Sequence, residues 1–120
     1  MSKALLIIDH GSKREDANKM LEGVAEMLRR QRPGLIVHIA HMELAEPTIR
    51  QGFDACVRDG ASAVIAHPYM LSPGRHATGD IPSMVEDAAA AFPHVKFCVT
   101  APLGLHDKIG EVVLERAGLL

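Results

Sequence analysis

Residues 4–8 read Ala-Leu-Leu-Ile-Ile and run directly into the polar turn Asp9-His10-Gly11-Ser12. A short continuous apolar run that stops at turn residues is typical of a strand buried on both faces, as in a parallel sheet. Apolar residues then recur at helical spacing, at Ala17, Met20, Leu21, Val24 and Leu28. Pro33-Gly34 ends that pattern. The chain therefore opens with a predicted strand, a turn and an amphipathic helix.

The same order repeats three more times along the chain. Strands are predicted at 35–42, 63–66 and 95–100, and each is followed by an apolar stripe of helical spacing: Ile49, Phe53, Cys56 and Val57; Ile81, Met84, Val85, Ala88 and Phe92; Ile109, Val112, Val113 and Ala117. Pro47 is expected in the first turn of the second helix, where its missing N–H costs nothing. The alternation predicts an α/β three-layer sandwich, with a four-stranded parallel sheet between helices on both faces. We expect residues 1–120 to form one domain.

Composition excludes several classes of partner. The chain has 120 residues, a net charge of -2, one Tyr, three Phe and no Trp. There is no electrostatic case for a nucleic acid partner, and stacking platforms for bases are not expected. Cys56 and Cys98 lie inside predicted elements, so we expect two buried thiols in a reducing compartment. No apolar run suits a signal peptide or a membrane span, which predicts a cytoplasmic protein with no membrane partner.

Three potential metal ligands follow three successive predicted strands. His10 follows the first strand, Glu43 the second, and His76 lies in the connection after the third. Because parallel strands end at one edge of the sheet, these side chains are expected to gather there. Two imidazoles and a carboxylate suit a divalent transition metal. The sequence predicts a metal site at this edge, although Glu43 alone could also be a solvated acid that caps the second helix.

The connection after the third strand, residues 67–79, is longer than the roughly 2–6 residues usual in α/β units. Long connections in compact domains are often functional. Met70 and Leu71 are apolar, whereas Arg75 has a cationic side chain and His76 a side chain that can bind a metal. We expect an ordered loop that covers the site.

Most of the seven histidines have simpler interpretations than metal binding. His38 and His94 lie early in their strands and are expected on the surface at the opposite edge. His106 is expected near the start of the last helix. His41 and His67 fall near the predicted site and are expected behind the ligands, with no assigned role.

Gly11 and Ser12 permit a second interpretation. A helix N-terminus behind a small-residue turn can bind phosphate or carboxylate through its free N–H groups. The glycine patterns of known phosphate loops are absent from the sequence. Ser12 is therefore predicted to be an ordinary N-cap.

Three stretches resemble one enzyme family. Asp9-His10-Gly11-Ser12-Lys13-Arg14, with Ala17-Asn18 after it, is similar to the opening motif of the small class II tetrapyrrole chelatases, the sirohydrochlorin cobaltochelatases and ferrochelatases of the CbiX/SirB type. Residues 68–76 with Asp80-Ile81-Pro82, and residues 42–47 around Glu43, resemble two further motifs. The resemblance spans residues 3 to about 102. Lys13 departs from the usual Arg, which would replace a bidentate contact by a point charge.

The resemblance implies a chelatase-like fold and a lyase that inserts a divalent metal, Co²⁺ first or else Fe²⁺ or Ni²⁺, into sirohydrochlorin for cobalamin or sirohaem biosynthesis. The metal is a substrate, and no permanent cofactor is expected. His10 and His76 would be metal ligands and proton acceptors, with Glu43 as the carboxylate ligand. The substrate's carboxylates would be bound by Ser12, Lys13, Arg14 and Arg75. Longer members hold two units in one chain, so a single unit implies a homodimer.

Two other function classes stay open at this point. A short chain with a His and Glu cluster would also suit a metal-binding carrier or sensor without catalysis. The flanking cations argue against a carrier, because a carrier needs no polyanion site. The third class is an α/β domain that binds a phosphate ligand at Gly11-Ser12, against which the missing glycine motifs count.

Overall fold

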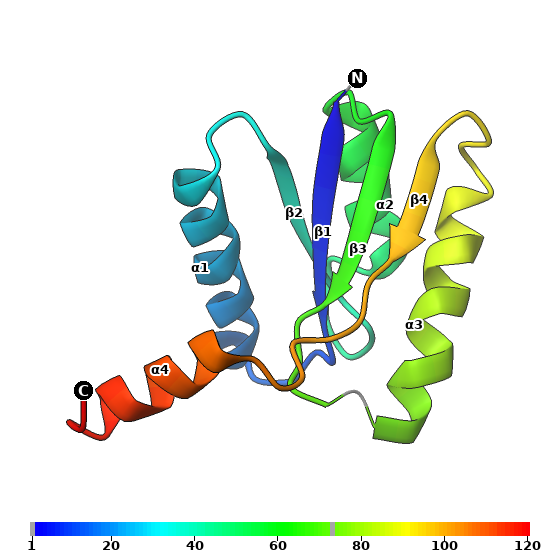
Figure 1. The fold of residues 1–120 in the computed structure, drawn as a ribbon. Helices are drawn as coiled ribbons and strands as arrows, with labels where there is room; N and C mark the ends of the chain where they lie inside the picture. The colour runs from blue at the N-terminus through cyan, green and yellow to red at the C-terminus, as the bar shows by residue number, and fades with distance from the viewer. Residues whose placement is uncertain (1, 73) are drawn as a thin grey trace.

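The computed structural model describes residues 2–72 and 74–120, and the side chains of residues 75–77 lie outside the described part. Strands and helices alternate along the chain: β1 Lys3–Asp9, α1 Glu15–Gln31, β2 Ile36–His41, α2 Ile49–Arg58, β3 Ala63–Pro68, α3 Gly74–Ala89, β4 Lys96–Val99 and α4 Asp107–Arg116 (Figure 1). The predicted α/β alternation is confirmed. Within the described ranges, no helix has the length and apolar character needed to cross a lipid bilayer.

All four strands are parallel, in the order β2-β1-β3-β4. Asp9 pairs with His41 where β1 and β2 end, and Ile8 pairs with Pro68 where β3 ends. We call this side of the sheet the carboxyl edge; it lies at the bottom of Figure 1, where the strand arrows point. The residues that follow β1 and β2 therefore start from adjacent positions.

Helices cover the two faces of the sheet unequally. In β1, Leu6 and Ile8 belong to a core cluster with residues of α2 and α3, such as Phe53 and Val85. Ile7, between them, belongs to a second cluster with the α1 residues Leu21, Val24 and Ala25. Successive strand residues point to opposite faces, so α1 lies on one face and α2 and α3 on the other. The predicted three-layer sandwich is confirmed.

The start of α2 corrects the role predicted for Pro47. Thr48 is the N-cap: its hydroxyl accepts from Gln51 N, and its own N–H donates to Gln51 Oε1 at 2.8 Å. This reciprocal capping box fixes the first helical residue as Ile49. Pro47 lies one residue before the cap, after a cis peptide bond with Glu46. The expectation that Pro47 occupies the first turn is wrong because Thr48 supplies the stronger start signal.

The start of α3 corrects the predicted loop at 67–79. The strand β3 extends to Pro68, and α3 already begins at Gly74, so residues 74–79 are helical. Gly74, Gly79 and Pro82 read as helix breakers in the sequence, yet all three lie inside this helix. The Thr78 hydroxyl donates to Gly74 O at 2.8 Å within this first part of the helix. Arg75 and His76 consequently stand in the first turn of a helix and not in a long loop.

The two cysteines differ in environment. Cys56 is fully buried in α2, as predicted, and burial raises the pKa of its thiol to about 12, with a further increase from Asp59 and an opposing backbone hydrogen bond. Cys98 is exposed, so the prediction that it is buried is wrong. The reason is that β4 is an edge strand. The helix α1 packs over β1 and β2, at the opposite side of the sheet, and does not cover β4.

Glycine at position 52 lets α2 approach the sheet closely. A Cβ there would lie 2.7 Å from Leu6 Cδ1 and 2.8 Å from the Ile39 carbonyl oxygen. We expect Gly52→Ala to lower the free energy of unfolding by about 1–3 kcal/mol through overpacking. Gly23→Ala, in the exposed middle of α1 with open space around it, should raise it by about 0.5–1 kcal/mol. Urea unfolding measures both, and equal stabilisation by the two substitutions would contradict this account of the α2 contact.

Candidate metal centre at the carboxyl edge

The pairing of β1 with β2 continues beyond the ends of the strands. Met42 N donates to Asp9 O at 2.8 Å, and Glu43 N donates to His10 O at 3.1 Å. Two of the three predicted ligands, His10 and Glu43, are therefore joined directly through their backbones, and both are exposed. The structure places these two residues side by side at the carboxyl edge.

Gly11 makes this close approach possible. Its φ is +88°, a conformation that strongly favours glycine, and a Cβ at this position would lie 1.8 Å from Glu43 O. Any other residue here would push the turn that carries His10 away from the segment that carries Glu43. The glycine of the Asp-His-Gly-Ser motif is thus required by the contact between the two candidate ligands.

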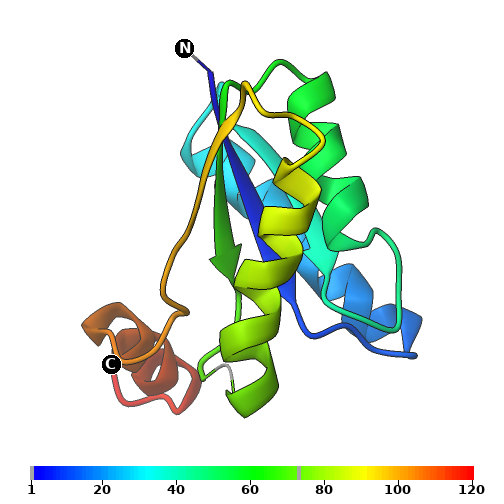
Figure 2. The ribbon, with the colours of Figure 1, turned by 90° about the vertical axis from the view of Figure 1, so that its right-hand side faces the viewer.

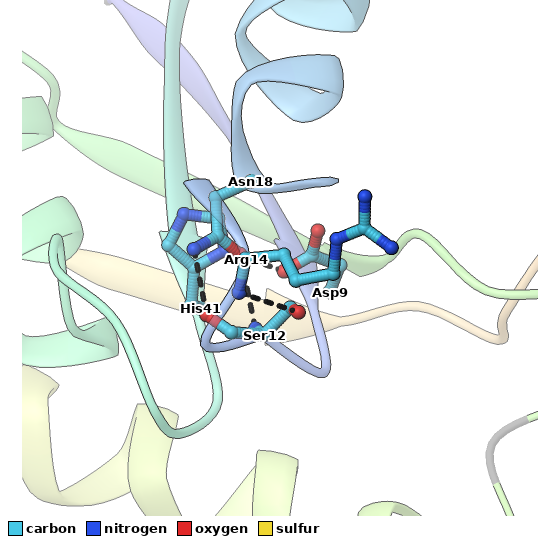
Figure 3. A network of polar contacts seen from close by, with 5 residues as sticks. All are labelled: Asp9, Ser12, Arg14, Asn18 and His41. Atoms are coloured by element: carbon cyan, nitrogen blue, oxygen red, sulfur yellow. Dashed lines mark hydrogen bonds and ion pairs between the residues drawn. The ribbon is translucent and has the colours of Figure 1, made fainter. Parts of the chain in front are cut away.

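A hydrogen bond between two strand-end side chains, Asp9 and His41, lies at the same turn. His41 is 2% exposed, and its Nδ1–H donates to Asp9 Oδ1 at 2.6 Å (Figure 3). The carboxylate offsets the cost of burying the imidazole and fixes which ring nitrogen carries the proton. No partner for His41 was predicted from the sequence. The strand register identifies the partner, because Asp9 and His41 are polar residues at the ends of two adjacent strands and are paired there.

Ser12 shapes the turn from within and does not cap α1. The N-cap of α1 is Arg14, so the predicted cap at Ser12 is wrong. Ser12 Oγ accepts from Arg14 N at 3.0 Å, while Asn18 Oδ1 accepts from Ser12 N and Asn18 Nδ2 donates to Ser12 O (Figure 3). Asn18 thus binds both the N–H and the C=O of Ser12 and fixes the turn. The N-cap of α1 is consequently Arg14, two residues later than predicted. The N–H groups of Ser12 and Arg14 are occupied by these bonds, which disfavours the phosphate interpretation.

The predicted cations lie around this edge. Lys13 is exposed, and Arg14 pairs with Asp16 at 3.2 Å with both side chains more than 70% exposed, so this pair contributes little stability. Arg75 and His76 are in the first turn of α3, whose beginning lies at the carboxyl edge in Figure 1. The side chains of Arg75 and His76 lie outside the described residues.

His67 lies near the end of β3, and no role was predicted for it from the sequence. Thr100 Oγ1 donates to Ala101 O at 2.9 Å, so it accepts the hydrogen bond from His67 Nδ1 at 2.8 Å. Burial lowers the pKa of His67, and a backbone hydrogen bond to Ala101 opposes that shift. The lowered pKa favours the neutral ring, in which Nδ1 carries the proton toward Thr100 and Nε2 is the acceptor.

The remaining histidines have local partners or open positions. His38 donates from Nε2 to Asp59 Oδ2 at 2.7 Å, and His94 is exposed in the turn before β4. His106 is the N-cap of α4, where its Nδ1 accepts from Lys108 N. Its predicted place at the start of the last helix is correct, and its partner is a backbone N–H.

Among the described side chains, no three of the types His, Cys, Asp and Glu are grouped closely enough to hold a metal ion. The third predicted ligand, His76, is outside that set. A groove of about 650 Å³ lies elsewhere, between α1 and α2 beside the edge strand β2, and its lining includes neither His10 nor Glu43. Within this groove, the guanidinium of Arg29 donates to the backbone carbonyl of Val37.

The fold and this edge define a class of parallel α/β proteins that present histidine and carboxylate groups where the strands end. The CbiX family profile matches residues 4–118, and the chain belongs to the CbiX family. Sirohydrochlorin ferrochelatase of Arabidopsis thaliana, a chloroplastic protein, is 46% identical over 112 residues, which are 93% of this chain and 50% of the relative. The chain thus spans about half the length of this relative.

Two further relatives differ in length. The sirohydrochlorin chelatase SirB from Bacillus subtilis subspecies spizizenii, solved in complex with cobalt, superimposes with a TM-score of 0.88 at 30% identity, covering 98% of this chain and 50% of SirB. Sirohydrochlorin cobaltochelatase of Methanococcus maripaludis is 29% identical over 140 residues, covering 96% of this chain and 97% of that protein. Relatives with one unit and with about twice that length both occur.

The neutral state of His67 predicts a pH dependence of stability. Its folded pKa lies below the ordinary value of 6.5, so below about pH 6.5 the unfolded chain binds more protons than the folded one. Stability from this group is complete above that pH and is lost as pH falls toward the folded pKa. We expect His67→Gln, which keeps a donor to Thr100, to lose less stability than the unsubstituted protein between pH 7.5 and 5. Urea unfolding across this range measures it, and identical pH profiles would exclude His67 as the cause.

Proposed function

We propose that this chain inserts a divalent metal ion into sirohydrochlorin. The observation that carries the proposal is the direct backbone bond between His10 and Glu43, with Gly11 packed against it. It joins two of the three motifs in which the chain resembles chelatases. The names of the relatives, which include a ferrochelatase and a cobaltochelatase, support the same reaction.

Metal insertion requires groups that bind the ion and accept protons, and the residues at this edge are of those types. Two protons leave the pyrrole nitrogens as the ion enters, so the protein must deliver the ion and accept protons. Neutral imidazole does both near neutral pH, which assigns His10 and His76 as ligands and proton acceptors. Glu43 supplies negative charge without the affinity of a thiolate, so the ion can be released into the ring. The hydrogen bond between Asp9 and His41 joins the two strand ends that carry these groups.

The substrate carries eight carboxylates, and the cations near the edge fit that charge. Lys13 and Arg14 lie three and four residues after His10, and Arg75 precedes His76. We propose that these three residues bind the tetrapyrrole. Ser12, with its hydroxyl and N–H engaged inside the turn, contributes by holding the backbone that presents Lys13.

We further propose that each chain supplies one chelatase unit and that two copies form the complete cleft. A relative of nearly the same length is named as a cobaltochelatase, whereas SirB and the Arabidopsis enzyme are about twice as long. Two copies of one unit would match the content of the longer chains. A large ring would then lie between two carboxyl edges. The proposed metals are Co²⁺ and Fe²⁺, with Ni²⁺ as a third candidate.

Incubating the purified protein with sirohydrochlorin and each of Co²⁺, Fe²⁺ and Ni²⁺, while following the absorption spectrum, tests the reaction. His10→Ala, Glu43→Gln and His76→Ala should each lower the insertion rate by about 100-fold or more. Stability should change by less than about 1 kcal/mol, because loop and edge residues contribute little core. His94→Ala, which removes an exposed histidine in the turn before β4, is the control and should keep the full rate. Normal insertion by His10→Ala would remove that residue from the mechanism.

Lys13→Ala and Arg75→Ala should raise the KM for sirohydrochlorin and leave the KM for the metal unchanged or lower. A cation repels a nearby divalent ion but attracts the carboxylates, and exposed contacts weaken as salt rises. The effect should therefore shrink in high salt. Arg30→Ala, the same loss of charge at the far end of α1, is the matched control. Lower metal affinity with normal tetrapyrrole binding would instead favour a metal carrier.

A further inference from the structure

Two exposed leucines lie at the carboxyl edge. Leu44 is 59% exposed in the segment between β2 and α2, and Leu71 is 62% exposed in the segment between β3 and α3. The strand β1, which leads into His10, lies between β2 and β3 in the sheet. Figures 1 and 2 show that the segments after these three strands lie at the same end of the sheet. The segments that carry the two leucines therefore lie on the two sides of the turn that carries His10.

Leu44 has a backbone conformation that its own side chain opposes. Its φ is +71°, a positive value that no other described residue apart from glycine has. This left-handed region is unfavourable for a leucine, and glycine or asparagine is its usual residue. Because the side chain is exposed, it recovers little of that cost by burial. Local stability therefore does not account for leucine at this position, and strain of this kind is concentrated where a side chain has a function.

Both leucines extend from segments that are anchored to the core. Met42, two residues before Leu44, packs against the core cluster on the α2 and α3 side of the sheet, and Met70, next to Leu71, belongs to that cluster. The carbonyl of Leu71 also accepts a hydrogen bond from Gly104 N at 3.0 Å. The two leucines are therefore held on a fixed backbone before any ligand binds, which lowers the entropy cost of a contact.

The proposed substrate has two kinds of surface. Its rim carries carboxylates, to which the cations Lys13, Arg14 and Arg75 are proposed to bind. The two faces of its conjugated ring are apolar, and those cations do not suit them. Neighbouring strands lie about 4.8 Å apart, so residues after β2 and β3 are about 10 Å apart, a span that a ring of four pyrroles covers. Exposed apolar side chains that are surrounded by polar groups are typical of ligand sites.

We propose that Leu44 and Leu71 bind the face of the tetrapyrrole ring and position its pyrrole nitrogens over His10. This inference rests on the proposed metal insertion and adds the contact that selects a flat, conjugated substrate. Burial of the two side chains against the ring removes apolar surface from water on both partners, which favours binding without any change of charge. It also excludes water from the place where the ion passes from His10 and Glu43 to the ring, so that the electrostatic attractions there are stronger.

Substitution by asparagine separates this role from a structural one. Asparagine tolerates the left-handed region, so Leu44→Asn should unfold at the same or a higher urea concentration than the unsubstituted protein. The same variant should bind sirohydrochlorin, titrated by absorption without metal, about tenfold more weakly. Leu71→Asn should weaken binding to a similar degree, whereas Leu44→Met, which keeps an apolar side chain, should retain it. A loss of binding without a loss of stability is expected of a ligand contact and not of a core contact.

Three further measurements define the contact. The affinity for Co²⁺ in the absence of sirohydrochlorin should be unchanged in both asparagine variants, because neither leucine is a metal ligand. High salt should leave the loss of sirohydrochlorin binding in place, whereas exposed charge contacts weaken as salt rises. Met27→Asn removes an exposed apolar side chain from the second half of α1. It is the matched control and should bind sirohydrochlorin normally.

Unchanged affinity of Leu44→Asn and Leu71→Asn for sirohydrochlorin, in a protein that inserts metal, would overturn this inference and leave the proposed function standing. The same conclusion would follow from a loss of affinity that disappears in high salt, that Met27→Asn shares, or that accompanies an equal loss of stability in Leu44→Asn. An unsubstituted protein that neither binds sirohydrochlorin nor inserts metal into it would overturn the inference and the proposed function together.

Discussion

The parallel pairing of β1 with β2 is the constraint on which the candidate site depends. The two strands end in register at Asp9 and His41, and the hydrogen bonds continue beyond them, because Met42 and Glu43 donate to the carbonyls of Asp9 and His10. Backbone bonds of this kind are insensitive to side-chain identity, so they set the position of His10 and Glu43 before any metal contact is made. The neighbouring groups refine that arrangement: Gly11 permits the close approach, Asn18 fixes the turn, and the Asp9 carboxylate keeps His41 satisfied where water is excluded.

Hydrophobic periodicity predicted most of the fold and the edge that carries the chemistry. Residues 4–8 are apolar without interruption because β1 is buried on both faces, and this pattern alone identifies a central parallel strand. His10 and Glu43 could be placed at one edge because strand ends in a parallel sheet meet there. The role of His41 was missed, since its partner Asp9 is found only when the exact register is known.

The incorrect predictions share a physical cause: each rested on a local sequence signal, and contacts with residues elsewhere in the fold decided the outcome. Gly74 and Gly79 suggest a loop, but they belong to a helix whose later residues Ile81 and Val85 are buried in the core. Cys98 has the pattern of a buried strand residue, and nothing in the pattern indicates that β4 lies at the edge of the sheet. Ser12 has the chemistry of an N-cap, yet Asn18 binds both of its peptide groups and moves the helix start to Arg14.

The second edge strand, β2, shows how this sheet is kept finite. Its outer side faces the groove between α1 and α2, where Arg29 binds the carbonyl of Val37. An unpaired strand edge is a template on which a foreign strand can add, and a charge placed against it is a common defence against aggregation. By binding the Val37 carbonyl, the Arg29 guanidinium occupies an acceptor that a strand added at this edge would need, and it places a positive charge there.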